Sequence, residues 1–257
     1  MKILNQQYDI EAFYAALVSA EKRLLMLDYD GTLAPFTTER DMAVPYPQIR
    51  ETLNSLFESD RTRVVIISGR TVDDLKKLLQ SPRMPELWGC HGLERHLRDG
   101  QYSIEKLPDE MREKLAELYN WTAEKSLVNF CEFKPSGAAY HWRGLPADET
   151  EQIHKMVVDR WHDIAESTDL ELYEFDGGVE IRVSGTNKAN PVAQLLTETD
   201  NNIPAAYLGD DLTDEDAFKA LKGRGLGVFV KGTLRDTLAD IWIVPPDELN
   251  DFLKRWL

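Results

Sequence analysis

The chain has 257 residues, enough for one large domain or two small ones, and its 42% apolar content is sufficient for a core. Its formal net charge of −15 argues against non-specific nucleic-acid binding, which requires clustered Lys and Arg. The same charge repels anionic substrates at long range, so an anion would need local cations, such as a bound metal, to offset it.

Cysteine content and hydropathy bear on where the protein is found. Cys90 and Cys131 lie in apolar stretches, and we expect buried free thiols rather than a disulfide. Met1–Tyr8 lacks a basic segment followed by an apolar one, and no apolar run approaches the ~20 residues of a membrane span. We therefore expect a cytoplasmic protein that binds neither membrane nor nucleic acid, and we also expect a monomer.

Short apolar runs alternate with amphipathic segments along most of the chain. The runs are typical of strands buried on both faces: Leu24–Leu27, Val64–Ile67, Leu87–Cys90, Ala205–Leu208, Leu226–Val230 and Ile241–Val244. Helical patterns occur at Tyr8–Glu21, Pro47–Glu58, Val72–Leu79, Pro191–Thr197, Asp214–Leu221 and Asp247–Trp256. The alternation predicts an α/β fold whose core is a doubly wound, parallel (Rossmann-like) sheet, with Thr71 capping its Val72–Leu79 helix.

The middle of the chain has a different order: helix, two strands, helix, two strands. These elements are Asp109–Glu124, Leu127–Phe133, Ala138–Arg143, Ala147–Glu166, Leu170–Phe175 and Val179–Val183. The order predicts an antiparallel sheet with helices on one face. We expect residues 107–183 to form an α+β domain inserted into a core made of residues 1–106 and 184–257.

Three polar clusters directly follow three of the predicted core strands. They are Asp28 and Asp30, Ser68-Gly69-Arg70, and the acidic run Asp210–Asp216. Because the carboxyl ends of parallel strands face one crevice where ligands bind, the clusters should meet in space. Each cluster alone can also be a polar loop, but that interpretation does not explain why all three follow strands.

The residue types indicate phosphoryl transfer. Of Asp28 and Asp30, one can attack while the other handles a proton, and both can approach a divalent cation. The carboxylates of Asp210–Asp216 suit Mg²⁺, although helix capping alone explains Thr213 and Glu215. Ser68 and Gly69 can offer a hydroxyl and an N–H group to a phosphoryl oxygen, and also fit an ordinary turn.

Other charged residues remain ambiguous from spacing alone. Lys188 can neutralise a phosphoryl oxygen or shield Asp28, and it can also be a solvated lysine. In the inserted domain, strand faces carry Glu132 with Lys134, His141 with Arg143, and Glu180 with Arg182. Such a face can bind hydroxyls and anions, or it can simply be the solvated side of a sheet.

Together these residues resemble the four motifs of the haloacid dehalogenase superfamily of phosphatases, with the insertion in place of its large cap. More narrowly, the chain is similar to the trehalose-6-phosphate phosphatases. That similarity rests on Asp28–Pro35, His91-Gly92, Glu132–Lys134, His141–Arg143, Val179–Arg182, Asn187-Lys188 and Gly209–Phe218. The family usually has Gly after the motif lysine, whereas Ala189 stands here; Ala would be strained if that position needs a positive φ.

The resemblance implies a role for each matching residue. Asp28 is implied as nucleophile and Mg²⁺ ligand, and Asp30 as the general acid and base that binds the metal through its carbonyl. Asp210 completes the ligands, with Asp211 or Asp214 acting directly or through water. Ser68 and Lys188 hold the transferring phosphoryl group. The implied substrate contacts are Gly69, Arg70, Lys134, His141, Arg143 and Glu180.

The resemblance thus implies a Mg²⁺-dependent phosphatase that converts trehalose 6-phosphate to trehalose and phosphate through an aspartyl-phosphate. One alternative keeps the reaction and changes the sugar phosphate, to a glucosyl- or mannosyl-phosphoglycerate. Another is a catalytically silent sugar-phosphate sensor, which has no need of Asp28, Asp30, Lys188 and Asp210 together.

Overall fold

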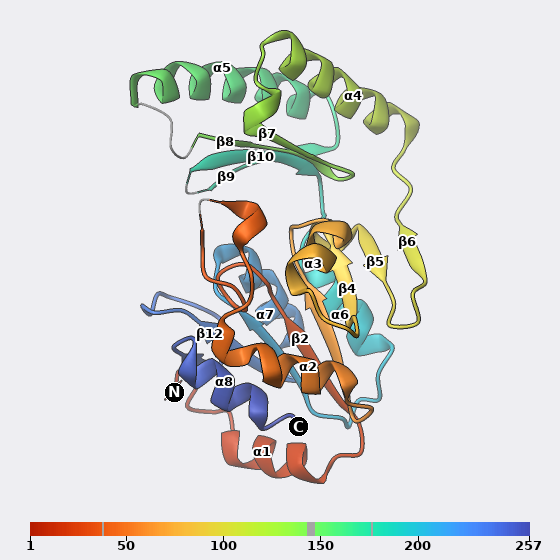
Figure 1. Ribbon diagram of the computed structural model, residues 1–257, viewed down its shortest axis with the longest axis vertical. Helices are drawn as coiled ribbons and strands as arrows, with labels where there is room; N and C mark the ends of the chain where they lie inside the picture. The colour runs from red at the N-terminus through yellow and green to blue at the C-terminus, as the bar shows by residue number, and fades with distance from the viewer. Residues whose placement is uncertain (38, 143–146, 176) are drawn as a thin grey trace. The chain divides into compact units, whose positions relative to one another are not determined.

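The computed structural model describes residues 1–37, 39–142, 147–175 and 177–257. The chain divides into two compact units (Figure 1). Unit 1 comprises Met1–Ser103 and Asn187–Leu257, and unit 2 is the intervening Ile104–Thr186. No helix within the described ranges is both long and apolar enough to cross a lipid bilayer.

Unit 1 is built on a nine-stranded sheet with the strand order β1-β13-β12-β11-β2-β3-β4-β5-β6. The strands are β1 (Lys2–Ile3), β2 (Arg23–Leu27), β3 (Thr62–Ile67), β4 (Glu86–Gly89), β5 (Glu94–His96), β6 (Tyr102–Ile104), β11 (Ala205–Gly209), β12 (Leu226–Val230) and β13 (Ile241–Ile243). The strands from β13 to β4 are parallel, whereas β1 and β5 pair antiparallel with their neighbours. The predicted parallel core is confirmed.

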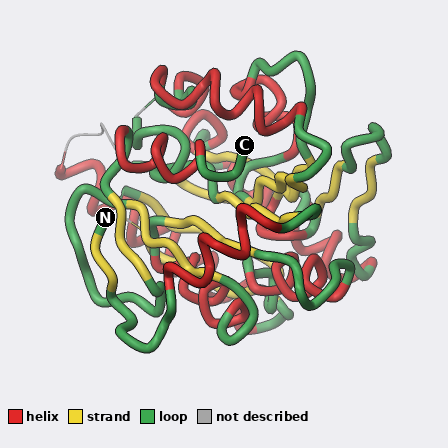
Figure 2. Tube along the Cα trace, turned by 90° about the horizontal axis from the view of Figure 1, so that it is seen from below, coloured by secondary structure: helices red, strands yellow, loops and turns green. Residues whose placement is uncertain are grey.

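Helices cover both faces of this sheet, as Figure 2 shows. One face packs against α1 (Ile10–Ser19), α2 (Arg50–Glu58), α3 (Val72–Leu79) and α8 (Asp247–Lys254), and the other against α6 (Ala189–Thr197) and α7 (Glu215–Leu221). Alternate residues of β2 serve the two layers: Leu25 and Leu27 face the first, Leu24 and Met26 the second. Each such fully buried side chain contributes about 1.5–3 kcal/mol.

Local sequence signals set several element boundaries. The Thr71 hydroxyl accepts a hydrogen bond from the Asp74 N–H at 3.2 Å, so the predicted cap of α3 is confirmed.

The predicted strand Leu127–Phe133 is wrong in its first half, because Val128–Phe130 is a 3₁₀ turn that leads into β7. The edge strands β1, β5 and β6 were not predicted, since two or three residues are too few to establish a period of two.

Unit 2 is a four-stranded antiparallel sheet with two helices on one face (Figure 1). Its elements are α4 (Asp109–Glu124), β7 (Cys131–Lys134), β8 (Gly137–His141), α5 (Ala147–Glu166), β9 (Leu170–Phe175) and β10 (Gly178–Val183). Leu118 of α4 and Trp161 of α5 are fully buried, as is Tyr140 of β8. The predicted inserted α+β fold is confirmed.

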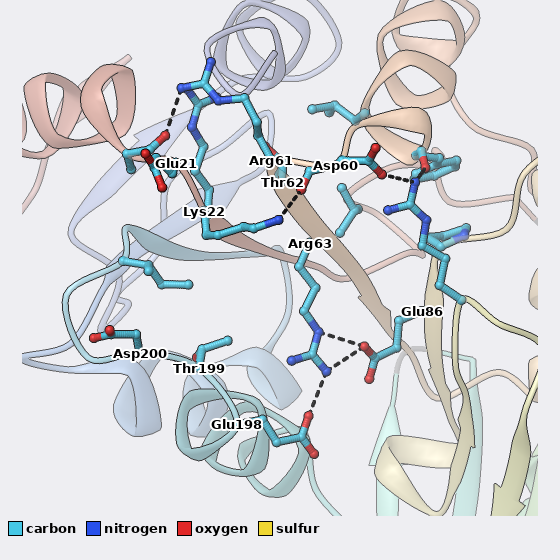
Figure 3. A pocket seen from close by; sticks show the side chains of 18 of the residues that line it. Glu21, Lys22, Asp60, Arg61, Thr62, Arg63, Glu86, Glu198, Thr199 and Asp200 are labelled. Carbon is cyan, nitrogen blue, oxygen red and sulfur yellow. Dashed lines mark hydrogen bonds and ion pairs between the residues drawn. The ribbon is translucent and has the colours of Figure 1, made fainter.

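A four-residue ion network ties α6 to the edge of the core sheet. Arg63 and Arg95 both bond to the buried carboxylate of Glu86 and to Glu198, which follows α6 (Figure 3 shows Arg63 with the two acids). Hydrogen bonds from Arg95 and Arg63 lower the pKa of Glu198 to about 2, despite partial burial. Glu198 therefore carries its negative charge at neutral pH.

Candidate active site

The carboxyl ends of the central parallel strands carry the polar motifs. Asp28 follows β2, Ser68 follows β3 and Asp210 follows β11, and these strands are adjacent in the order β11-β2-β3. Lys188 lies at the N-cap of α6. Adjacent parallel strands end at the same edge of the sheet, so the fold brings motifs up to 182 positions apart into one place.

A buried lysine links two of the carboxylates. Lys188 Nζ lies 2.6 Å from Asp28 Oδ1 and 2.6 Å from Asp214 Oδ1, and all three side chains are at most 5% exposed. Asp210 belongs to the same group, since ligand atoms of Asp28, Asp210 and Asp214 lie within 4.8 Å of one another. The convergence expected from the sequence is therefore present.

The loop after β2 approaches Asp210 so closely that only glycine fits at position 31. Gly31 has a φ of +85°, and a Cβ there would lie 2.4 Å from Asp210 Oδ2. Any side chain would therefore be strained and would also displace the carboxylate. Ala189, by contrast, is the first residue of α6 and is not among the residues with positive φ, so the strain considered for it does not arise.

Burial dominates the electrostatics of the cluster. It raises the pKa of Asp28 to about 7, with Lys188 opposing and Asp214 adding to the shift. Burial, followed by the charges of Asp28 and Asp214, raises the pKa of Asp210 to about 9. Burial alone would lower the pKa of Lys188, but the adjacent Asp214 and Asp28 carboxylates outweigh it and raise that pKa.

The carboxylate oxygens that remain free suit a divalent cation. Among the described residues, the buried atoms Asp28 Oδ2 and Asp210 Oδ1 have no hydrogen-bond partner. Asp214 differs: its Oδ1 accepts from Lys188 and Tyr207, and its Oδ2 accepts from the N–H groups of Asp210 and Asp211. Unpaired buried carboxylate oxygens are costly without a cation, and oxygen ligands are those that Mg²⁺ prefers.

Asp30 has a different environment from Asp28. Its side chain is 32% exposed and forms a bidentate ion pair with Arg70, with Nε–Oδ2 and Nη2–Oδ1 distances of 2.7 Å. The Ser68 hydroxyl accepts from the Arg70 N–H at 3.1 Å. Arg70, expected from the resemblance to contact substrate, thus holds Asp30 and is joined to the Ser68 loop.

The predicted site residues of unit 2 also cluster. Lys134 Nζ lies 2.7 Å from Glu180 Oε1 and 3.6 Å from Glu132 Oε2, and His141 Nε2 lies 3.7 Å from the same Glu132 oxygen. Ala139 pairs with both Glu132 and Glu180, so its small side chain separates the two acids across the sheet. Lys134 also lines a cavity of about 410 Å³. Arg143 lies outside the described residues.

Two residues at the site were not predicted from the sequence. Lys231 follows β12, and its Nζ lies 3.2 Å from the carbonyl oxygen and 3.4 Å from Oδ2 of Asp210. The same strand-end signal that singled out Asp28 applies to Lys231. Tyr207 is fully buried on β11, and its hydroxyl donates to Asp214 Oδ1 at 2.6 Å. The sequence offers one indication of this role: a tyrosine within a fully buried strand needs a hydrogen-bond partner for its hydroxyl.

Replacing Tyr207 by phenylalanine should destabilise the protein by about 1.5–3 kcal/mol, the usual worth of a buried hydrogen bond to a charged group. The substitution should also lower kcat/KM for the reaction catalysed at this site about tenfold, because Asp214 would hold Lys188 less firmly. Urea unfolding and steady-state kinetics measure the two effects. Tyr140→Phe is the matched control, since that buried hydroxyl has no partner among the described residues; equal effects in both variants would contradict the role of Tyr207.

A cavity elsewhere in unit 1 does not coincide with these motifs. It has a volume of about 720 Å³ and opens at the amino ends of β2 and β3, where Arg23, Thr62 and Arg63 line it (Figure 3 labels Thr62 and Arg63). None of the strand-end residues described above lines it. The motifs, rather than this cavity, therefore locate the candidate active site.

Comparison with known sequences identifies relatives along nearly the whole chain. The model of the trehalose-phosphatase family matches residues 26–235. Probable trehalose-phosphate phosphatase H of Arabidopsis thaliana is 30% identical, over 93% of this chain and 73% of its own length. The trehalose-phosphatase of Schizosaccharomyces pombe is 26% identical over 91% of this chain, which spans only 30% of that protein.

Solved structures agree in fold. The trehalose-6-phosphate phosphatase of Aspergillus fumigatus is 25% identical with a TM-score of 0.67, and the match covers 98% of each chain. The C-terminal domain of the Candida albicans trehalose-6-phosphate phosphatase superposes with a TM-score of 0.78 over 98% of each chain; at 21% identity, that likeness supports the fold alone.

Proposed function

The chain belongs to the trehalose-phosphatase family, whose members are phosphoric monoester hydrolases, and we propose that it is a Mg²⁺-dependent phosphatase that hydrolyses trehalose 6-phosphate to trehalose and inorganic phosphate. The observation that carries the mechanism is the buried cluster of Asp28, Lys188 and Asp210. It combines a carboxylate that can act as nucleophile, a fixed cation and unpaired oxygens, which suit phosphoryl transfer through an aspartyl-phosphate.

In the first half of the proposed reaction, a carboxylate oxygen of Asp28 attacks phosphorus and the bond from phosphorus to the sugar oxygen breaks. Asp30 donates a proton to the departing sugar oxygen, which leaves as trehalose. Ser68 and Lys188 hold the phosphoryl oxygens during the transfer. Arg70 bonds both oxygens of Asp30, so this pairing has to open before Asp30 can pass a proton.

In the second half, water hydrolyses the aspartyl-phosphate. Asp30, now a carboxylate, accepts a proton from the water as its oxygen bonds to phosphorus. The bond to Asp28 then breaks, which releases inorganic phosphate and restores the Asp28 carboxylate. Asp30 thus acts first as the acid and then as the base, and no other proton carrier is needed.

We propose that Asp28, Asp210 and the Asp30 carbonyl hold Mg²⁺, which when bound supplies charge neutralisation for the phosphoryl group. The unpartnered oxygens of Asp28 and Asp210 support their assignment. Asp214 is occupied by four hydrogen bonds, which supports an indirect role as the residue that orients Lys188. Asp211 acts through water in this scheme.

Without a divalent cation, the free energy of unfolding should fall as pH rises from about 5 to 9. Burial raises the pKa of Asp28 to about 7 and that of Asp210 to about 9, from an ordinary 3.8, so the folded state binds more protons than the unfolded state in this window. Adding Mg²⁺ at a hundredfold its Kd should restore about 2.7 kcal/mol.

Urea unfolding at pH 5, 7 and 9, in EDTA and in Mg²⁺, measures this dependence. Asp210→Asn should flatten the profile in EDTA, because it removes the more strongly shifted of the two groups. If the free energy of unfolding in EDTA changes by the same amount from pH 5 to 9 in the wild type and in Asp210→Asn, the assignment of the raised pKa to Asp210 is contradicted.

We further propose that unit 2 is the cap and that Lys134, His141 and Glu180 bind the disaccharide phosphate, with Arg143 assigned on resemblance alone. The ion pairs among Lys134, Glu180 and Glu132 support this, because they hold donors and acceptors for sugar hydroxyls in fixed positions. The charged ends are at most 16% exposed, so they are held rather than freely solvated.

Replacing Lys134 or Glu180 by alanine should lower kcat/KM for trehalose 6-phosphate by at least about tenfold, and should leave hydrolysis of p-nitrophenyl phosphate nearly unchanged. The reason is that a small aryl phosphate has no disaccharide for these residues to bind. Lys155→Ala, at an exposed position of α5, is the control. Equal losses on both substrates would remove the proposed specificity role.

Phosphate release from a panel of sugar phosphates, with and without Mg²⁺, tests the function itself. We expect trehalose 6-phosphate to be the preferred substrate and release to depend on Mg²⁺. Preference for glucosyl- or mannosyl-phosphoglycerate would change the substrate assignment and keep the mechanism. No release from any member, with binding intact, would indicate a sugar-phosphate sensor instead.

A further inference from the structure

The turn Cys90-His91-Gly92, directly after β4, has an unusual backbone conformation. All three residues have positive φ: 50° for Cys90, 55° for His91 and 112° for Gly92. Residues other than glycine rarely adopt a positive φ, and two successive ones need strong support from their surroundings. Backbone strain of this kind concentrates at functional sites.

Main-chain hydrogen bonds fix this turn to the loop after β3. The His91 N–H donates to the Ser68 carbonyl at 2.9 Å, and the Cys90 N–H donates to the Arg70 carbonyl at 2.8 Å. The Ser68 N–H in turn donates to the Trp88 carbonyl at 2.9 Å. The two strand ends are therefore joined through their backbones on both sides of Gly69.

The imidazole of His91 packs directly on Gly69. A Cβ at position 69 would lie 2.5 Å from His91 Nε2 and 2.7 Å from Cε1, so the ring occupies the space that any other residue's side chain would need. The ring is itself buried, with His91 7% exposed. Ring and loop are thus in contact, and each restricts the position of the other.

The other end of the turn abuts the first turn of α6. A Cβ at Gly92 would lie 2.9 Å from Pro191 Cδ, and Lys188 is the N-cap of the same helix. The turn therefore lies between two elements that bear phosphoryl-binding residues: the loop with Ser68 and the helix with Lys188.

We propose that His91 is a positioning residue that sets the spacing between the Ser68-Gly69 loop and Lys188, so that a phosphoryl group is held from both sides. This inference rests on the proposed phosphatase function. His91 itself touches no reacting atom in the scheme; its ring acts through Gly69. Reactions that depend on positioning lose about a hundredfold in rate when a group moves by 1 Å, so the ring should affect turnover strongly.

His91→Gly tests the proposal without adding strain, because glycine accepts the left-handed conformation at position 91. With p-nitrophenyl phosphate and Mg²⁺, we expect kcat/KM to fall about 10- to 100-fold, mainly through kcat. His91→Asn, which also tolerates this φ, should show a similar loss. His96→Asn is the matched control: His96 is equally buried, on β5, and its loss should change Tm and leave kcat/KM unchanged.

Gly69→Ala gives an independent test through the same contact. Alone it should impair turnover, because its Cβ would collide with the imidazole. In Gly69→Ala/His91→Gly the collision partner is gone, so the double variant should retain at least tenfold more activity than the product of the two single effects.

The outcomes separate the two proposals. A wild-type protein that releases no phosphate removes the phosphatase function, whatever the variants do. An active wild type with His91→Gly unchanged, or with multiplicative effects in the double variant, overturns the role of His91 alone. If Tm and kcat/KM in the His91 variants fall no further than they do in His96→Asn, the role of His91 is merely structural.

Discussion

Asp28→Asn should reduce phosphate release at least about a thousandfold while leaving the fold intact. The amide is not a nucleophile, so no aspartyl-phosphate can form. Its oxygen can still accept from Lys188, whose Nζ lies 2.6 Å from the present carboxylate oxygen. Because burial raises the pKa of Asp28 to about 7, replacing the carboxylate by a neutral group of equal size should not destabilise the buried site.

Two measurements separate chemistry from folding in this variant. Phosphate release from trehalose 6-phosphate and from p-nitrophenyl phosphate reports the reaction, and urea unfolding reports the fold. Asp251→Asn, at an exposed position of α8, is the matched control and should behave as wild type. Full activity in Asp28→Asn would refute the covalent mechanism, whichever substrate is used.

Lys188→Gln should be the most destabilising substitution in the site. Lys188 is the cation between Asp28 and Asp214, and its removal leaves two buried carboxylates without their partner. Removing one member of a buried ion pair costs about 3–5 kcal/mol. Loss of a fixed charge beside the transferring phosphoryl group should also lower kcat by about 10²–10³.

Urea unfolding in EDTA and in Mg²⁺ measures the stability change. Mg²⁺ should restore part of the lost stability, because it neutralises Asp28, one of the two carboxylates that Lys188 pairs with, but it should not restore the lost kcat. Lys219→Gln, on the exposed side of α7, should lie within about 0.5 kcal/mol of wild type. If Lys188→Gln unfolds at the wild-type urea concentration in EDTA, Lys188 does not compensate the buried acids.

The periodicity of the sequence was sufficient to predict the architecture. Residues 24–27 and 205–208 are continuous apolar runs, and such runs are strands buried on both faces regardless of their partners. Once the sheet is parallel, the polar residues that follow adjacent strands must gather at one edge. The gathering of Asp28, Ser68 and Asp210 was therefore accessible from local patterns and the rule for parallel sheets, whereas Lys188 follows no core strand and lies at the N-cap of α6.

The pairing of individual side chains was decided only by the tertiary structure. Arg70 bonds Asp30, Tyr207 bonds Asp214, and Lys231 approaches Asp210. These partners depend on strand order, register and helix placement, which set distances of a few ångströms between residues far apart in the chain. Hydropathy and spacing predict which face of a strand or helix a residue lies on. A hydrogen bond also depends on where the partner residue lies, and the packing of the whole core fixes that position.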